Sequence, residues 1–246
     1  MSKIIYSLYI FSGILLFFLT ACENSLNTST KTPTEKSTSQ QNNDSTKKVA
    51  NSKIQQELDQ LEAQQGNSNR TIWQQPRMII QLLGNLKEKT IADIGAGPFG
   101  YFSFQLVNEA KKVIAIDIDK NALAFMDSLR ADILPANKLD ALETRLASPN
   151  DPNLKPAEAD VIILMNIFAY LPNPDQYLET LKRGLVADGK LLIVDFKMRS
   201  LPLGPPQDEK VPLYLIEQNL KKVGFTIELV DDRTLAYQYM IIASKV

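Results

Sequence analysis

The feature that most constrains the fold is an alternation of short apolar runs with amphipathic stretches, which begins near residue 90. Most of the apolar runs are nearly continuous, as is typical of strands that are buried on both faces. An alternation of such strands with helices predicts a parallel sheet that is covered by helices on both sides. The strands expected from this pattern are TIADI (90–94), KVIAID (112–117), LETRLA (142–147), DVIILMNIF (160–168) and KLLIVDF (190–196).

Helix boundaries are indicated by prolines, glycines and apolar spacing. Pro76 and Pro174 suit the first turn of a helix, where the missing amide hydrogen costs nothing. The Asp188-Gly189 pair predicts a turn ahead of the fifth strand. The expected helices cover residues 54–64, 76–86, 99–109, 121–131, 174–186 and 211–223.

The last two predicted strands, FTIELVDD (225–232) and TLAYQYMIIAS (234–244), follow each other closely. A connection this short cannot make a crossover, so the two strands must form an antiparallel hairpin. The predicted fold is therefore α/β and Rossmann-like, with a doubly wound, mostly parallel seven-stranded sheet that ends in this hairpin.

The N-terminal segment has the pattern of an export signal. Lys3 precedes an apolar run over residues 4–19, which is shorter than the roughly 20 residues of a membrane-spanning helix. The tetrapeptide LTAC (19–22) resembles the lipobox of bacterial lipoproteins. The resemblance implies cleavage before Cys22 and lipidation of its thiol. An ordinary signal peptide, or an uncleaved anchor with an incidental cysteine, is the alternative.

Residues 23–52 are dominated by Ser, Thr, Asn, Gln and Lys and contain no aromatic residue. Such a segment buries too little apolar surface to fold, so a disordered tether is predicted. The expected organisation is a signal peptide over 1–21, lipidated Cys22 and tether over 22–52, and one domain over 53–246. The expected location is the bacterial cell envelope, with attachment to a membrane through Cys22. Glu23 favours the outer membrane, but the sequence leaves the membrane and its face open.

The amino-acid counts exclude several classes of chemistry. The chain has no histidine and a single cysteine, which excludes histidine bases, catalytic triads, intramolecular disulfides and most zinc sites. No metal is expected. The net charge of −1 and the pI of about 5.7 give no electrostatic basis for binding nucleic acid.

The segment IADIGAGPFGYF (91–102) carries a G-x-G-x-x-G pattern, formed by Gly95, Gly97 and Gly100. Glycines after a strand allow a cofactor to approach the backbone closely. Asp117, which ends the second strand, is placed to accept hydrogen bonds from ribose hydroxyls. A dinucleotide and S-adenosylmethionine would both use these features, so they do not distinguish between the two cofactors.

Asp93, two residues before the first glycine, does distinguish between them. Its carboxylate would repel a pyrophosphate, but it could pair with the ammonium group of S-adenosylmethionine, directly or through water. Here the sequence resembles class I S-adenosylmethionine-dependent methyltransferases, whose first motif is D-x-G-x-G-x-G. The resemblance extends over nearly all of the domain. It includes RTIWQQP (70–76), ETRLASPNDPNL (143–154), LKRGLVADGKLLIVDFK (181–197), LPLGPP (201–206) and YQY (237–239).

The resemblance implies S-adenosylmethionine as the cofactor and assigns residues to it. Asp151 takes the place of an acidic residue that contacts the adenine amino group, and Asn166 lies where cofactor and substrate would meet. Trp73 and Gln74 could close over the cofactor or pack in the core. The expected cofactor-binding residues are Asp93, Gly95, Gly97, Gly100, Asp117, Asp151 and Asn166.

Methyl transfer asks little of the protein, because the sulfonium is already activated and positioning supplies most of the acceleration. A general base is needed only where the acceptor must lose a proton, and Asp195 and Tyr170 are the candidate catalytic residues. The glycine loop departs from the family pattern, since Pro98-Phe99 stands where one residue is usual.

Three functions are compatible with these residues. The first is methyl transfer from S-adenosylmethionine to an unidentified small-molecule or lipid-like acceptor. The second is an inactive envelope lipoprotein that uses the fold as a binding module, which the lengthened loop and the separation from cytoplasmic cofactor favour. The third is an NAD(P)-dependent oxidoreductase that uses the G-x-G-x-x-G pattern.

Overall fold

The structure is a computed structural model that describes residues 52–63 and 69–245. The predicted signal peptide, Cys22 and all but the last residue of the predicted tether lie outside the described residues. Across residues 52–63 and 69–245, no helix combines the length and apolar character needed to span a bilayer.

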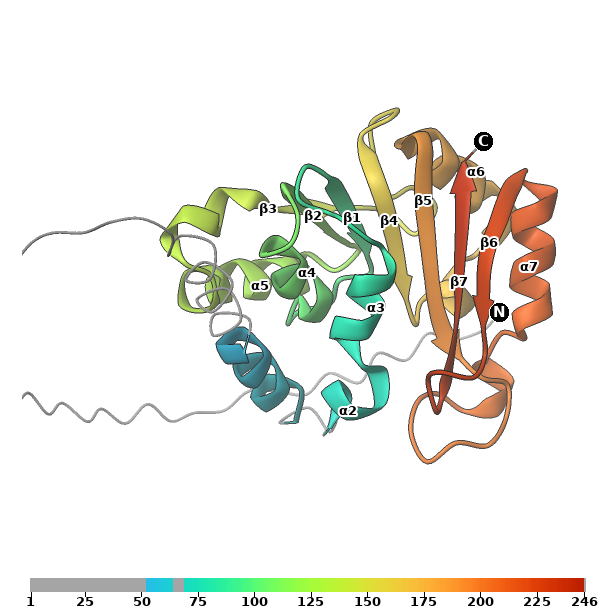
Figure 1. Cartoon of the computed structure of the whole chain (residues 1–246), viewed down its shortest axis with the longest axis horizontal. Helices are drawn as coiled ribbons and strands as arrows, with labels where there is room; N and C mark the ends of the chain where they lie inside the picture. Colours follow the sequence, from blue (N-terminus) through green and yellow to red (C-terminus); the bar gives the residue numbers. More distant parts are fainter. Residues whose placement is uncertain (1–51, 64–68, 246) are drawn as a thin grey trace, which may run out of the picture. The chain divides into compact units, whose positions relative to one another are not determined.

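The described residues form a seven-stranded sheet with the order β3-β2-β1-β4-β5-β7-β6 (Figure 1). Neighbouring strands from β3 to β5 are parallel, and β7 runs antiparallel to both β5 and β6. The predicted fold class is therefore confirmed. The strands are β1 (Thr90–Ile94), β2 (Lys112–Asp117), β3 (Leu142–Leu146), β4 (Ala159–Met165), β5 (Leu185–Phe196), β6 (Phe225–Asp231) and β7 (Gln238–Lys245).

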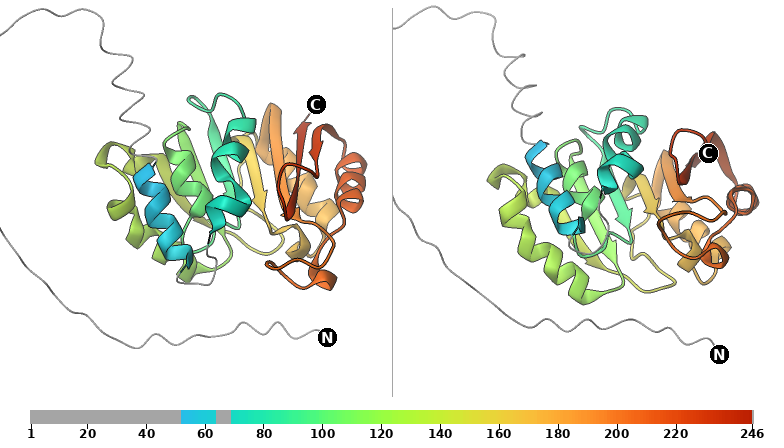
Figure 2. Two further views of the ribbon diagram at one scale, coloured as in Figure 1. Left: turned by 60° about the horizontal axis from the view of Figure 1, so that its bottom comes forward. Right: turned by 90° about the horizontal axis from the view of Figure 1, so that it is seen from below.

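Helices cover both faces of this sheet (Figure 2). The helix of residues 52–63 packs on one face with α3, α4 and α5, whereas α6 and α7 cover the other. The predicted helix starts at Pro76 and Pro174 are confirmed. The helices are α2 (Arg70–Gln74), α3 (Pro76–Leu82), α4 (Tyr101–Val107), α5 (Lys120–Ile133), α6 (Pro174–Gly184) and α7 (Leu213–Lys222), with 3-10 turns η1 (Ala136–Ala141), η2 (Phe168–Tyr170) and η3 (Gln207–Glu209).

Each face of the sheet buries its own apolar cluster. Ile91 of β1 joins a cluster with Phe104 of α4, whereas its neighbour Ala92 joins a second cluster with Leu178 of α6. All four of these residues are fully buried. Because successive side chains of a strand point to opposite faces, strands buried on both sides must be apolar throughout.

The turn predicted at Asp188-Gly189 is a bulge within β5. Pairing with β4 passes from Ala159–Leu185 directly to Val161–Lys190, so the residues between Leu185 and Lys190 bulge out. Asp188 has a φ of 58° in this bulge. The strand therefore begins before the predicted turn, and not after it.

In the C-terminal hairpin, β7 lies between β5 and the edge strand β6. Because β7 is antiparallel to β5, its first residue, Gln238, lies opposite Phe196, the last residue of β5. A residue near the end of the chain thus reaches the edge where the parallel strands end, which is where doubly wound sheets bind ligands.

Candidate cofactor and substrate site

The glycine loop follows β1 and is held against β2. The backbone amides of Gly95 and Ala96 both donate to the Ile116 carbonyl, at 2.8 and 3.1 Å. Gly95, Gly97 and Gly100 have φ values of 73°, 69° and 51°, in the left-handed region that glycine tolerates best. Gly100 is the N-cap of α4, so the loop leads directly into this helix.

The three glycines meet different surroundings. A Cβ on Gly95 would lie 2.6 Å from Ile167 Cγ2, and one on Gly100 would lie 3.0 Å from Met126 Sδ. Gly95 is therefore needed for packing, whereas a side chain at Gly100 would press against Met126. Around a Cβ on Gly97 no atom lies within 4 Å. This open flank is space that a cofactor can fill and that a side chain would obstruct.

The residue that lengthens the loop is accommodated toward α5. The ring of Phe99 packs edge-on against Phe125 of that helix, with 5.7 Å between the ring centroids. Pro98, the other residue of the pair, is exposed. The extra residue therefore packs on α5, and the flank of Gly97 stays open.

Asp93 lies beneath the loop, on the face of the sheet that α4 covers. Its side chain is buried, and its Oδ2 accepts a hydrogen bond from Ser103 Oγ at 2.6 Å. Burial raises the pKa of Asp93 to about 6, although the Ser103 hydrogen bond and the charge of Arg70 act in the opposite direction. The carboxyl is thus poised to titrate just below neutral pH.

Asp117 joins the end of β2 to the glycine loop. Its Oδ2 accepts a hydrogen bond from the Gly97 amide at 2.8 Å, and its Oδ1 accepts one from the Asp119 amide at 2.9 Å. The structure therefore joins Asp117 to the glycine loop at Gly97, and the predicted contacts of Asp93, Gly97 and Asp117 with a cofactor stay predictions.

Asp151 and Asn166 follow the neighbouring strands. Asp151 is exposed after β3, and its Oδ1 accepts a hydrogen bond from the Asn153 amide at 2.8 Å. Asn166 follows β4 with a φ of 61°, and its side-chain oxygen accepts a hydrogen bond from Gln238 Nε2. Their predicted contacts with the cofactor stay predictions.

Asp195 and Tyr170, the two predicted catalytic residues, differ in their exposure to solvent. Asp195 is 3% exposed, and its two carboxylate oxygens accept hydrogen bonds from the Phe168 and Phe196 amides at 3.2 and 2.7 Å. Burial raises its pKa to about 6. Tyr170 ends η2 and is 65% exposed. Asp195 thus fixes the start of the turn that carries Tyr170, and the catalytic role of both residues stays a prediction.

Arg70 of α2 organises a polar cluster beside Asp93. Its Nε donates to Gln74 Oε1 at 2.6 Å, and its guanidinium pairs with Glu62 and lies 4.1 Å from the centroid of the Tyr101 ring. In the sequence, Arg70 stands out only as part of RTIWQQP. Nothing else in the sequence indicated that Arg70 lies near Asp93. The contact between Arg70 and Tyr101 joins residues that are distant in the chain.

Three buried glutamines, Gln55, Gln74 and Gln238, each have a side-chain polar atom without a partner among the described residues. Gln74 and Gln238 are both 0% exposed, and Gln74 Nε2 and Gln238 Oε1 have no hydrogen-bond partner among the described residues. An unmade hydrogen bond of a buried group costs about 1–3 kcal/mol. A bound molecule would remove this cost. Nothing in the sequence singled out Gln238, which stands there only as the middle residue of YQY (237–239).

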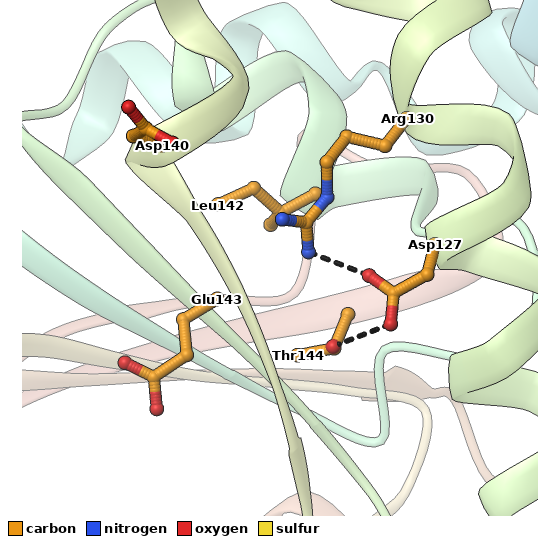
Figure 3. Close-up of a pocket in the computed structure, with 6 residues that line it drawn as sticks. All are labelled: Asp127, Arg130, Asp140, Leu142, Glu143 and Thr144. Carbon is orange, nitrogen blue, oxygen red and sulfur yellow. Dashed lines mark hydrogen bonds and ion pairs between the residues drawn. The ribbon is translucent and has the colours of Figure 1, made fainter.

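A separate hollow lies beside the edge strand β3 (Figure 3). It has a volume of about 540 Å³. Asp127 accepts hydrogen bonds there from Arg130 at 2.5 Å and from Thr144 at 2.8 Å. No predicted site residue lines it. The lining residues are Asp127, Arg130, Asp140, Leu142, Glu143 and Thr144.

Comparison with known proteins agrees with this geometry. A family model described as a methyltransferase domain matches residues 85–234. The fold is similar to that of a SAM dependent methyltransferase from Aquifex aeolicus, with a TM-score of 0.67 and 24% identity over 80% of this chain and 98% of that one. A comparison with curated proteins found no match.

Two further structures show how widely the fold is used. An S-adenosylmethionine dependent methyltransferase from Mesorhizobium loti has a TM-score of 0.57 and 14% identity, over 68% of this chain and 96% of that one. The cyclase SpnF also has a TM-score of 0.57, with 12% identity over 69% and 81%. The family match covers more than half of the residues. This chain belongs to the methyltransferase domain family, and the family and fold together imply S-adenosylmethionine as its cofactor.

Proposed function

We propose that the protein transfers a methyl group from S-adenosylmethionine to a small-molecule or lipid-like acceptor, and that it does so as a lipoprotein of the bacterial cell envelope. The observation that carries this proposal is the open flank of Gly97, whose amide donates a hydrogen bond to Asp117. This edge of the sheet offers a phosphate-free nucleoside both the space and the acceptors that it needs.

The chain's own residues have distinct tasks in this proposal. Bound S-adenosylmethionine would supply an activated methyl group on its sulfonium. Asp93 would hold the ammonium group, and Asp117 would accept hydrogen bonds from the ribose hydroxyls. Each Asp117 oxygen already accepts one backbone hydrogen bond, which fixes the carboxylate and leaves a lone pair on each oxygen for the ribose. Positioning in a water-poor site then accounts for the rate.

Exposed apolar side chains support a lipid-like acceptor. Ile118, Tyr170 and Met198 follow β2, β4 and β5, and they are 51%, 65% and 49% exposed. These three strands end at the same edge of the sheet as the glycine loop. Apolar surface around a site favours contact with an apolar acceptor or with a lipid surface. The proposed tether would keep the domain close to such a surface.

The second candidate function is an inactive binding module. It is favoured by the internal partners of the two key carboxylates, since Asp93 bonds to Ser103 and Asp117 to two backbone amides. The cyclase SpnF has a similar fold, and a fold alone does not fix a reaction.

Calorimetry on the purified full chain separates these functions. Micromolar binding of S-adenosylmethionine that Asp93→Ala abolishes would support methyl transfer. Absence of heat with both S-adenosylmethionine and NAD would support the binding module, and heat with NAD alone would support an oxidoreductase. Unchanged affinity in Asp93→Ala would refute the role of Asp93.

A further inference from the structure

We propose that Gln74 and Gln238 form the subsite that recognises the methyl acceptor, and that the acceptor presents an uncharged group with both a hydrogen-bond donor and a hydrogen-bond acceptor. A carboxamide is the simplest such group. This inference rests on the proposed methyl transfer. It names the part of the site that would select the substrate.

The orientation of the Gln74 amide is fixed by its neighbour. Its Oε1 accepts a hydrogen bond from Arg70 Nε at 2.6 Å, and a guanidinium can only donate. The Nε2 group must therefore point away from Arg70. It is buried and has no partner among the described residues. Gln74 thus provides an unpaired hydrogen-bond donor at this position.

Gln238 presents the complementary atom. Its Nε2 donates to the side-chain oxygen of Asn166, which leaves its buried Oε1 without a partner in the described part of the chain. Asn166 precedes Ile167, whose side chain packs against Gly95 of the glycine loop. The unpaired acceptor is therefore connected, through Asn166 and the next residue Ile167, to the loop expected to hold the cofactor.

An aromatic pair connects the two glutamines. The Trp73 ring lies 5.9 Å from the Phe196 ring, centroid to centroid. Trp73 precedes Gln74 in α2, and Phe196 is the residue opposite Gln238 in the sheet. Opposed residues in antiparallel strands point to the same face. Gln238 and Phe196 thus share the sheet face that α2 approaches through Trp73.

This face is also the one to which Asp93 points. Strand pairing places Asp93 beside Ile163 of β4 and, through it, beside Leu192 of β5. Because side chains alternate along a strand, Leu192 and Phe196 share a face. Gln238 and Asp93, the carboxylate proposed to bind the ammonium group, therefore point to the same side of the sheet.

The two unpaired atoms define the ligand. Gln74 Nε2 needs an acceptor and Gln238 Oε1 needs a donor, so a group with both satisfies each. A carboxylate or phosphate offers only acceptors and would be repelled by Gln238 Oε1, whereas an ammonium group would leave Gln74 Nε2 unpaired. The aromatic pair would contact the apolar part of the molecule.

The experiment uses the fluorescence of Trp73, which is the only tryptophan of the full chain. Benzamide and benzoate are titrated separately into the purified full chain, since they differ in the donor that the amide carries. We expect benzamide to change the Trp73 emission saturably and to bind at least about tenfold more tightly than benzoate. Equal affinities, or no response to benzamide at millimolar concentration, would overturn the proposal.

Gln74→Glu is the test variant, because it keeps an acceptor for Arg70 and replaces the unpaired donor by an acceptor. It should weaken benzamide binding at least about tenfold. Gln81→Glu, at an exposed position of α3, makes the same charge change and should have no effect. If thermal melting shows that Gln74→Glu is unfolded, Gln238→Met takes its place with the same expected loss. An undiminished affinity in the folded variant refutes the subsite.

Calorimetry with S-adenosylmethionine on the same samples keeps the two proposals apart. Cofactor binding without selective benzamide binding would refute the subsite and leave methyl transfer standing. Selective, Gln74-dependent benzamide binding without cofactor binding would refute methyl transfer and retain the subsite as that of a binding module.

Discussion

Asp93 and Asp195 point to opposite faces of one sheet. Asp93 accepts its hydrogen bond from Ser103 of α4 on one face, whereas Asp195 lies opposite Tyr239, which packs in the apolar cluster of α6 and α7 on the other. Both carboxyls are buried and both have a raised pKa. Only Asp93, however, shares a face with the Trp73–Phe196 aromatic pair, so we expect the two residues to respond differently to ligands.

Affinity for S-adenosylmethionine should fall as the pH drops below 6. The pKa of Asp93 is raised to about 6, so about one carboxyl in eleven is ionised at pH 5, and an ammonium group needs the ionised form. Calorimetry should show about tenfold weaker binding at pH 5 than at pH 7. Asp93→Asn should bind weakly and equally at both values. Affinity of the unmodified chain that does not change over this range would contradict the assignment.

The free energy of unfolding should also depend on the titration of Asp93, but in the opposite direction: it should fall as the pH rises. Because the folded-state pKa of Asp93 is raised from 3.8 to about 6, the neutral form is favoured in the folded state. This contribution is fully present below pH 3.8 and is lost as the pH rises through about 6. At pH 8, Asp93→Asn should therefore be more stable than the unmodified chain, by about 3 kcal/mol.

Urea unfolding at pH 4 and pH 8 measures this difference. The matched control is Asp132→Asn, which removes an exposed carboxylate of α5 and should leave the free energy of unfolding within about 0.5 kcal/mol. If Asp93→Asn proves less stable than the unmodified chain at pH 8, the hydrogen bond from Ser103 outweighs the cost of burying the charge.

Alanine at Gly95 and at Gly97 should have different consequences. At Gly95 the new Cβ would meet Ile167 at 2.6 Å in addition to the strained φ, so we expect a loss of roughly 2–3 kcal/mol in unfolding free energy. At Gly97 the Cβ meets no atom within 4 Å, and only about 1 kcal/mol of backbone strain applies.

The functional readout for these two variants is cofactor affinity at equal folded fraction. Gly97→Ala should lower the affinity for S-adenosylmethionine more than tenfold, because its side chain occupies the open flank. Full affinity in Gly97→Ala would show that the cofactor does not use this flank. Gly95→Ala combined with Ile167→Ala should recover part of the lost stability, since the contact is removed.

Cys22→Ser tests the proposed lipidation. In a bacterial host, the unmodified chain should incorporate labelled fatty acid and fractionate with membranes. The variant should lose the label, because serine lacks the thiol that is acylated. Ser25→Ala, three residues further on, should keep it. Labelling that persists in Cys22→Ser would exclude the lipoprotein proposal.

The fold could be predicted from the sequence because its strands are unusually uniform. TIADI and KVIAID coincide with β1 and β2, since a strand between two helical layers must be apolar along its length. Strand ends were less accurate, since the strand predicted over 160–168 ends at Met165 and the one predicted from residue 234 begins at Gln238. In β5, the polar residues before Lys190 indicated a turn although the chain remains paired around a bulge.

The candidate site was predictable where its residues lie in one local motif. Asp93 and Gly97 are close in the chain, and Asp117 follows from the regular length of one strand–helix–strand unit. Gln238 and Asn166 are 72 positions apart, and their contact depends on the insertion of β7 beside β5. The pattern of KLLIVDF shows that Asp195 and Phe196 face opposite sides, but not which side holds the site.

The direction of β7 has a practical consequence. This strand begins at Gln238, which is part of the proposed substrate subsite, and runs away from it. Ser244 therefore pairs with Lys190, at the opposite end of the paired strands. A tag, fluorophore or solid support attached to the C-terminal end would thus sit far from the ligand edge. Immobilisation through that end should present the site to solution.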